Sequence, residues 1–285
     1  CSPVAIHRAT PMMVSDGSTD TEPGSAAPSL RVCRAGGEQM SKPLIPDNLA
    51  LLHQGEEFLR AKSIEAIQAN AKLLLHLNTT EHAMDLLDVF RQFKTDDEDL
   101  KVIQVLGIRQ FNAFASATKL LLSGYTQTSA LILRDVLETV FLVDYFRTER
   151  AAITKWRMAD KATRLKELKP IKIREALDQR DGFTNKKRAE IYELFSELAG
   201  HATMQGIAML RPKGMDAHIG PFFDVTALEA GLSEMGRLAV QAGENTGAFV
   251  PLGWPEGKTS LKAFGAEKLR WFAEFYPRIF AQEQS

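Results

Sequence analysis

The segment from Thr126 to Phe146 constrains the fold more than any other part of the chain. Its residues are apolar on nearly every side of a predicted helix, and such a helix normally lies buried at the centre of a protein. Four charged residues occur within it: Arg134, Asp135, Glu138 and Asp144. Each charge costs roughly 2.5–3.5 kcal/mol near the centre of a bilayer, which outweighs the apolar gain. We therefore expect a buried helix of a soluble protein and no membrane span.

A second helix is predicted directly before this one. It begins in the acidic run at residues 96–99, which suits the positive end of a helix dipole, and it ends at Ser123-Gly124. The two helices together predict an antiparallel hairpin at about residues 101–148. Upstream of the hairpin the apolar spacing predicts two more helices, from Asp47 to about Leu77 and from Thr79 or Thr80 to Phe90.

The stretch from Arg211 to Phe223 is the least helical part of the chain. It contains Pro212, Gly214, Gly220 and Pro221. We expect a small irregular or short β insert there, because these residues break helices and form turns. The predicted fold class is therefore all-α, a multi-helix bundle around a central buried helical hairpin with this insert near residues 211–223.

Residues 1–40 differ in composition from the rest of the chain. They are rich in Ser, Pro, Gly, Thr and Ala and show no periodicity, so we expect a disordered or non-native extension followed by a single helical domain over residues 41–285. Two explanations stay open: Met40 is the true start, or Cys1 is the lipidated first residue of a processed lipoprotein. Both cysteines, Cys1 and Cys33, fall in this segment, so no disulfide is expected within the domain.

The overall charge argues against some classes of partner. A net charge of −1 and a pI near 6.7 do not favour nucleic-acid or anionic-membrane binding through bulk charge. Residues 154–190 hold twelve Lys and Arg against six Asp and Glu, which indicates a solvated basic face because the two signs are interspersed. The scarcity of cysteine fits a cytoplasmic protein.

Arg134 and Glu138 are the first candidate site residues. At helical spacing they lie about 40° apart on one face, and Tyr145 is a close neighbour on that face. Charges are rarely buried unless paired, and the i,i+4 spacing lets these two form an ion pair. Two interpretations stay open: the pair fixes helix packing, or it lines a pocket.

The second candidate site follows a later helix, at Tyr192, Glu197 and His201. Glu197 and His201 are four residues apart, and a carboxylate beside an imidazole suits acid–base chemistry, although such pairs are also common on solvated surfaces. If this helix packs on the central one, His201 could meet Arg134 and Glu138. The candidate catalytic residues are therefore Arg134, Glu138 and His201, and the candidate ligand-binding residues are Tyr192, Glu197 and Tyr145.

Evidence for a metal or cofactor site is weak. His76 and His82 flank a predicted helix junction near Asp85, but the chain has no Glu-x-x-His pair of the kind found in di-iron bundles. It also lacks a phosphate-binding glycine loop in a strand–loop–helix context. We expect no metal and no cofactor.

The stretch Gly124 to Glu138, the Tyr192-to-His201 segment and Ile219-Gly220-Pro221-Phe222 together resemble a pattern in uncharacterised bacterial all-helical proteins. The resemblance covers most of residues 100–240. It implies Arg134, Glu138 and His201 as the special positions and implies no established activity.

These proteins also look distantly similar to HEPN domains, some of which are ribonucleases in toxin and antiphage systems. Their catalytic signature is an Arg followed, after four to six residues, by a His on one helix. Only Arg211 and His218 have that spacing here, and Pro212 and Gly214 between them predict a break in the helix.

Two functions follow as expectations. The first is a helical binding or regulatory domain, in a bacterial defence or stress response, whose partner is a small polar ligand or a protein. The alternative is a hydrolytic enzyme acting on RNA or nucleotides, in which His201 is the general acid/base, Glu138 orients it and Arg134 holds an anion. Nucleic-acid binding and homo-oligomer formation stay open.

Overall fold

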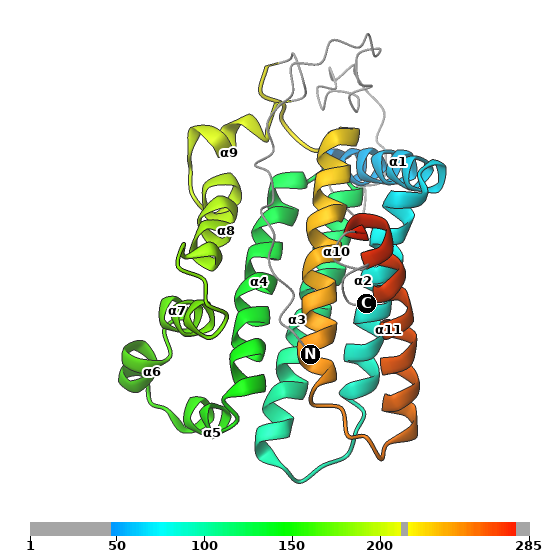
Figure 1. Cartoon of the computed structure of the whole chain (residues 1–285). Helices are drawn as coiled ribbons and strands as arrows, with labels where there is room; N and C mark the ends of the chain where they lie inside the picture. The colour runs from blue at the N-terminus through cyan, green and yellow to red at the C-terminus, as the bar shows by residue number, and fades with distance from the viewer. Residues whose placement is uncertain (1–46, 212–215, 278–285) are drawn as a thin grey trace, which may run out of the picture.

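The computed structural model describes residues 47–211 and 216–277, which form helices joined by turns and short loops (Figure 1). The predicted extension at residues 1–40 lies outside the described residues, as do residues 212–215 of the predicted insert. Within the described ranges, no helix has the length and hydropathy needed to cross a bilayer. The predicted all-α fold class is confirmed, since 80% of the described residues are helical and they contain no strand.

Long helices running side by side form the body of the fold. They are α2 (Ala71–Phe90), α3 (Glu98–Leu122), α4 (Thr126–Thr148), α10 (Val225–Gly247) and α11 (Pro255–Phe275). α4 contacts α3 and α10, α10 also packs on α2, and α2 in turn contacts α11. Buried apolar side chains from all five helices belong to one core cluster, so the bundle has a continuous interior.

The predicted hairpin is formed by α3 and α4, which pack against each other along their length (Figure 1). Asp97 caps α3, because its carboxylate accepts hydrogen bonds from the backbone nitrogens of Asp99 at 2.9 Å and Leu100 at 3.2 Å. The turn between the helices requires Gly124. Its φ is +85°, and a Cβ there would lie 2.9 Å from the backbone nitrogen of Phe222.

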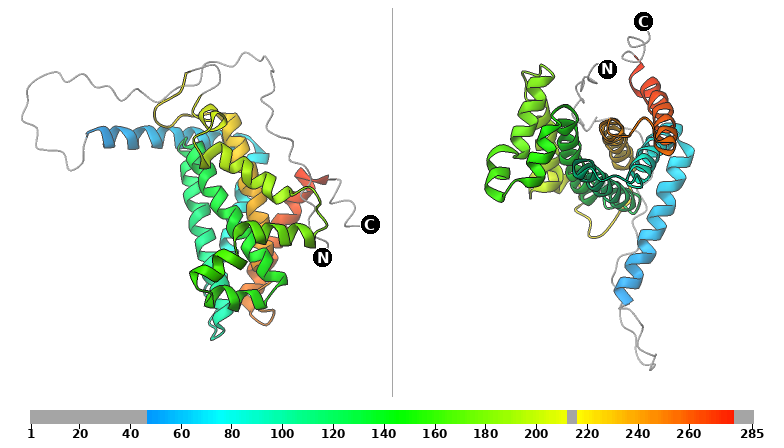
Figure 2. Two further views of the ribbon diagram at one scale, coloured as in Figure 1. Left: turned by 90° about the vertical axis from the view of Figure 1, so that its left-hand side faces the viewer. Right: turned by 90° about the horizontal axis from the view of Figure 1, so that it is seen from below.

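The boundary between the first two helices differs from the prediction. α1 (Asp47–Ala69) ends eight residues before Leu77. The next residue, Asn70, caps α2, because its side chain accepts a hydrogen bond from the backbone nitrogen of Lys72 at 3.0 Å. Thr79 and Thr80 lie inside α2 instead of starting a helix. Their hydroxyls donate to carbonyls one turn earlier, which satisfies them within the helix. α1 projects from one end of the bundle (Figure 2).

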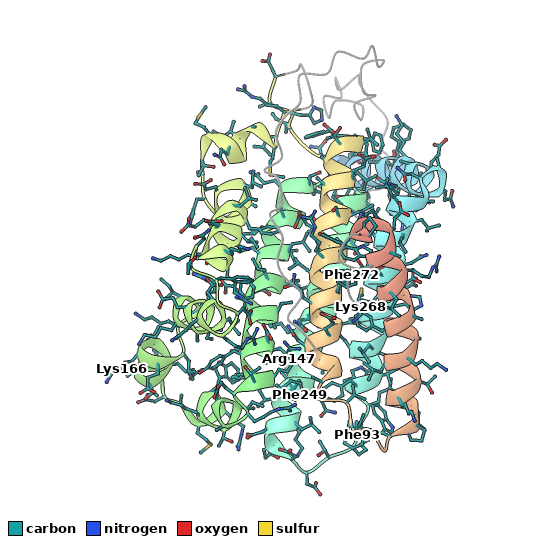
Figure 3. All side chains as sticks on the ribbon, in the orientation of Figure 1. Phe93, Arg147, Lys166, Phe249, Lys268 and Phe272 are labelled. Carbon is teal, nitrogen blue, oxygen red and sulfur yellow. The ribbon has the colours of Figure 1, made fainter. Side chains whose placement is uncertain are left out.

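Short helices cover the opposite side of α4 from the core bundle. They are α5 (Ala151–Met158), α6 (Lys161–Glu167), α7 (Pro170–Arg180), α8 (Lys187–Phe195), the π-helical turn η1 (Ser196–Gly200) and α9 (Met204–Ala208). α7, α8 and η1 contact α4 directly. α6 lies at the outer edge, where Lys166 extends away from the protein (Figure 3). The central helix is therefore covered on both sides, as its apolar sequence predicts.

The predicted β component of the insert is wrong for the part that the structure describes. Residues 211 and 216–223 contain no strand. Two of their backbone nitrogens bond to turns instead: His218 donates to the Leu210 carbonyl at 2.9 Å and Phe222 to the Gly124 carbonyl at 3.4 Å. A strand needs a second strand to pair with, and no strand occurs among the described residues.

Candidate ligand-binding pocket

Arg134 and Glu138 pair with each other on the face of α4 that α7 and α8 cover. Arg134 Nη2 lies 3.8 Å from Glu138 Oε1, as the i,i+4 spacing predicts. The pair is half-buried, with side chains 25% and 33% exposed. It therefore lies at the edge of the core, where one side of Glu138 can still meet another molecule.

Tyr192 of α8 links this pair to α7. Arg134 Nη2 donates a hydrogen bond to the Tyr192 hydroxyl, and its guanidinium carbon lies 4.5 Å from the centre of the tyrosine ring. The guanidinium carbon of Arg174, from α7, lies 4.1 Å from the same ring centre. Because an aromatic face attracts cations, one tyrosine holds two arginines from two helices close together.

Arg174 is a buried cation with no anionic partner. The residue is 8% exposed, and its Nε and Nη1 atoms are buried without a hydrogen-bond acceptor. Among the described residues no carboxylate forms an ion pair with it; the Tyr192 ring is its compensating contact. Buried guanidinium groups are normally paired with an acid, because an uncompensated buried charge is costly. Arg174 therefore carries a charge that no acidic side chain of the described residues compensates.

Arg174 lines a pocket of about 440 Å³ between α3, α4, α5 and α7. This volume lies within the range of small-molecule sites. Most of the wall is apolar, and the lining residues are Val105, Leu106, Arg109, Asp135, Glu138, Thr139, Phe141, Leu142, Trp156, Leu168, Pro170, Ile173 and Arg174. A mainly apolar cavity with a few convergent polar groups is typical of a ligand-binding site.

The other charged residues of the pocket differ in how far an opposite charge already compensates them. Arg109 and Asp135 form an ion pair across α3 and α4, so each neutralises the other. Glu138 accepts no hydrogen bond from any described residue, and its ion pair with Arg134 is near the limit of such contacts. The pocket therefore presents one cation, Arg174, and one carboxylate, Glu138, with unused bonding capacity.

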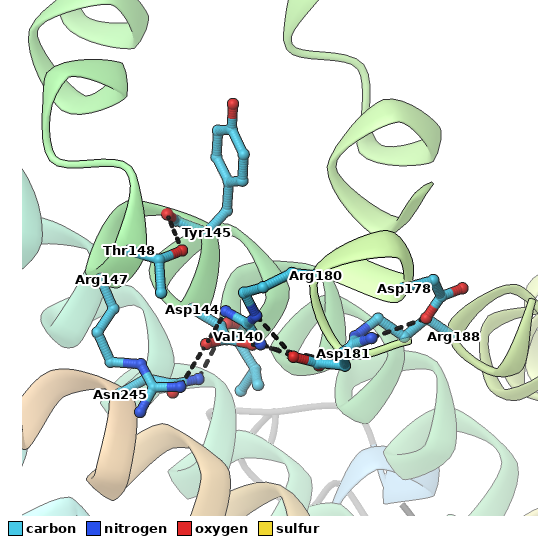
Figure 4. A network of polar contacts seen from close by, with 10 residues as sticks. All are labelled: Val140, Asp144, Tyr145, Arg147, Thr148, Asp178, Arg180, Asp181, Arg188 and Asn245. Carbon is cyan, nitrogen blue, oxygen red and sulfur yellow. Dashed lines mark hydrogen bonds and ion pairs between the residues drawn. The ribbon is translucent and has the colours of Figure 1, made fainter. Parts of the chain in front are cut away.

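A buried charge network anchors α7 and thereby positions Arg174 (Figure 4). Arg180, one and a half turns further along α7, binds both oxygens of Asp144 on α4, with distances of 3.0 and 2.9 Å. Arg188 of α8 donates to Asp178 at 2.7 Å and also to Asp181. Bidentate guanidinium–carboxylate pairs have a fixed geometry, so the network sets how α7 and α8 lie on α4.

The network also fixes protonation states. Burial acts to raise the pKa of Asp181, but the hydrogen bonds from Arg180 and Arg188 outweigh it and hold that pKa below its usual range. The hydrogen bonds with Asp181 and Asp144 raise the pKa of Arg180. Asp181 and Arg180 therefore stay charged at neutral pH and attract each other.

Sequence reasoning missed Arg174 and this network. It interpreted residues 154–190 as a solvated basic face, which is wrong for Arg174 and Arg188, since they are 8% and 4% exposed. The sequence of α7 itself indicated that Arg174 is buried. Its buried residues are Ile173, Arg174, Leu177 and Asp178, a helical stripe in which an Arg and an Asp accompany two apolar residues. Charges on an apolar stripe indicate burial.

The remaining sequence candidates, Glu197, His201 and Tyr145, do not line the pocket. His201 and Glu197 are exposed, and among the described residues neither side chain forms a hydrogen bond or ion pair with Arg134 or Glu138. The regular helix is interrupted by the π-helical turn before it reaches His201. The His201 backbone nitrogen bonds to the Ser196 carbonyl five residues earlier, and the backbone of His201 itself is extended. Tyr145 packs beside Phe146, with ring centres 6.3 Å apart.

The two histidines considered for a metal have separate partners. His76 Nδ1 accepts a hydrogen bond from the Trp271 indole at 2.9 Å, and His82 contacts the Asn78 carbonyl at 2.9 Å. Over residues 47–211 and 216–277, no group of three or more His, Cys, Asp or Glu side chains could hold a metal ion. His76 is thus a core residue of the α2–α11 contact.

Comparisons with known protein families, with curated proteins and with solved structures gave no match to this chain. Inference about function therefore rests on the residues of the pocket.

Proposed function

We propose that this protein is a helical binding domain whose pocket beside α4 takes a small organic anion with an apolar body. The observation that carries the proposal is Arg174, a buried guanidinium without an acidic partner on the wall of a 440 Å³ cavity. A carboxylate of the ligand supplies the missing partner. Apolar wall residues such as Leu142 and Trp156 contact the rest of the molecule.

Binding is favoured over hydrolysis by what the pocket contains. The hydrolase alternative assigns the general acid/base to His201, and His201 does not line the cavity. Among the described residues, no histidine or cysteine lines it at all. Arg134 and Glu138, assigned to catalysis in the hydrolase alternative, act instead as the support of Tyr192 and as a polar wall of the pocket.

The test uses two probes of the same shape, 3-phenylpropionate and its uncharged amide, titrated calorimetrically into the full chain. We expect the acid to bind more tightly than the amide. Arg174→Met keeps the length of the side chain but removes its charge, and should weaken the acid roughly 10–100-fold, because hydrogen bonds to charged groups contribute about 1.5–3 kcal/mol.

The matched control is Arg91→Met, which removes an exposed arginine at the end of α2 and should leave affinity for the acid unchanged. The proposal is overturned if the acid binds no better than the amide, or if R174M binds the acid as tightly as the unchanged protein.

A further inference from the structure

Glu138 restricts the chemistry of the ligand. Its carboxylate lines the same cavity as Arg174, it accepts no hydrogen bond from the described residues, and its side chain is 33% exposed. A ligand with only a negative charge would bring that charge into a cavity that already contains this carboxylate. Like charges repel, so a plain anion gains from Arg174 and loses from Glu138.

The other polar wall residues do not change this balance. Arg109 and Asp135 form their own ion pair, so they add no net charge. Arg134, which does not line the cavity, offsets part of the Glu138 charge at 3.8 Å but makes no hydrogen bond to it, so the Glu138 oxygens stay free to accept hydrogen bonds. Glu138 and Arg174 form no ion pair with each other within the described part of the chain. The cavity is thus lined by a cation of α7 and an anion of α4 that are not paired with each other.

Resting on the proposed function, we infer that the ligand is a zwitterion of the amino-acid type with an apolar side chain. Its carboxylate pairs with Arg174 and its ammonium group pairs with Glu138. Its side chain lies against Leu142 and Trp156 on the apolar wall. Each charge of the ligand then meets an opposite charge, and both unused bonding positions of the pocket are filled.

Three probes with the same aromatic ring separate the alternatives: L-phenylalanine, 3-phenylpropionate, which lacks the ammonium, and 2-phenylethylamine, which lacks the carboxylate. We expect L-phenylalanine to bind the full chain at least about tenfold more tightly than either single-charge probe, as one further charge-assisted hydrogen bond predicts. Glu138→Gln keeps the shape but removes the charge, and should make L-phenylalanine and 3-phenylpropionate bind alike. Arg174→Met should weaken both.

The outcomes separate this inference from the proposed function. Equal or tighter binding of 3-phenylpropionate to the unchanged protein, or an unchanged preference in E138Q, overturns the zwitterion and leaves a binder of simple anions. Arg174→Met without effect on either probe overturns the proposed function itself. Glu65→Gln, an exposed carboxylate on α1 remote from the cavity, is the matched control and should leave the preference unchanged.

Discussion

The guanidinium carbon of Arg174 lies 4.1 Å from the centre of the Tyr192 ring, while Tyr192 accepts a hydrogen bond from Arg134 at its hydroxyl. A tyrosine of α8 thus joins an arginine of α7 to an arginine of α4. Arg174 contacts this ring and pairs with no acidic side chain of the described residues, so its positive charge stays available to a ligand. The relationship makes Tyr192 a positioning residue of the pocket.

Substitutions of Tyr192 should separate its ring from its hydroxyl. Tyr192→Phe keeps the ring under Arg174, so affinity for 3-phenylpropionate should change less than about threefold while the protein loses roughly 1 kcal/mol of stability with the Arg134 hydrogen bond. Tyr192→Leu removes the ring and should weaken binding about tenfold. Calorimetry and thermal unfolding measure the two effects, and equal affinities of the two variants would contradict the role given to the ring.

Asp144 should be the most sensitive position of the charge network. Asp144→Asn removes the carboxylate that accepts two hydrogen bonds from Arg180 and one from Arg147. Arg180 keeps its ion pair with Asp181, while Arg147 loses its acidic partner. Because Asp144 is buried but both arginines are partly exposed, we expect a loss of roughly 1.5–3 kcal/mol, which urea unfolding would detect. Glu274→Gln, which breaks an exposed pair with Lys72, should cost less than about 1 kcal/mol. Equal losses in the two variants would show that the network is not a scaffold.

His76 should make the protein sensitive to acid. Burial, with the nearby positive charge of Arg237, lowers the pKa of His76 from 6.5 to about 4. Between these pH values the unfolded chain binds a proton that the folded chain does not, so the free energy of unfolding falls as pH decreases. The contribution of neutral His76 to the free energy of unfolding is fully present above about pH 6.5, and about 3 kcal/mol of this contribution is lost by pH 4.

His76→Asn isolates this effect, because asparagine offers Trp271 an acceptor but does not titrate in this range. Stability measured by urea unfolding from pH 7 to pH 4 should fall more steeply for the unchanged protein than for H76N. Parallel pH profiles would rule out His76 as the source of the acid sensitivity.

Close helix packing makes a glycine of α10 hard to replace. A Cβ on Gly243 would overlap the Phe264 ring of α11, whereas a Cβ on Gly265 would meet nothing within 4 Å. Gly243→Ala should therefore destabilise the protein by roughly 1 kcal/mol or more, since overpacking costs about 1–3 kcal/mol and exceeds the gain in helix propensity. Gly265→Ala should stabilise it by up to about 1 kcal/mol. Thermal unfolding of both variants checks the contrast, and stabilisation by G243A would contradict this packing.

The hairpin was predictable because its signals are local. The acidic cap before Glu98, the break at Ser123-Gly124 and the apolar surface of residues 126–146 all lie within or beside the helices that they define. The end of α1 was not predictable from apolar spacing alone. Asn70 interrupts the helix through its own backbone conformation, with φ −129°, while the apolar pattern continues past it.

The site was predicted only in part, because it depends on which helices meet. Helical spacing was sufficient for the Arg134–Glu138 pair, and Tyr192, predicted from the sequence as a ligand-binding residue, contacts Arg134 of that pair. Arg174 was missed because its burial comes from α7 packing on α4, which a charge count over residues 154–190 cannot show. His201 was expected beside Arg134, but the π-helical turn at η1 ends before it and leaves it exposed.

The central claim, that Arg174 binds the anionic group of a ligand, is tested most directly by nitrogen–proton correlation spectroscopy of the arginine Nε–Hε groups during a titration with 3-phenylpropionate. R174M identifies the Arg174 signal by its disappearance, and exposed Arg60 and Arg91 serve as internal references. We predict that the Arg174 signal shifts to saturation while the Arg60 and Arg91 signals stay in place. An Arg174 signal that does not move at saturating probe would contradict the account.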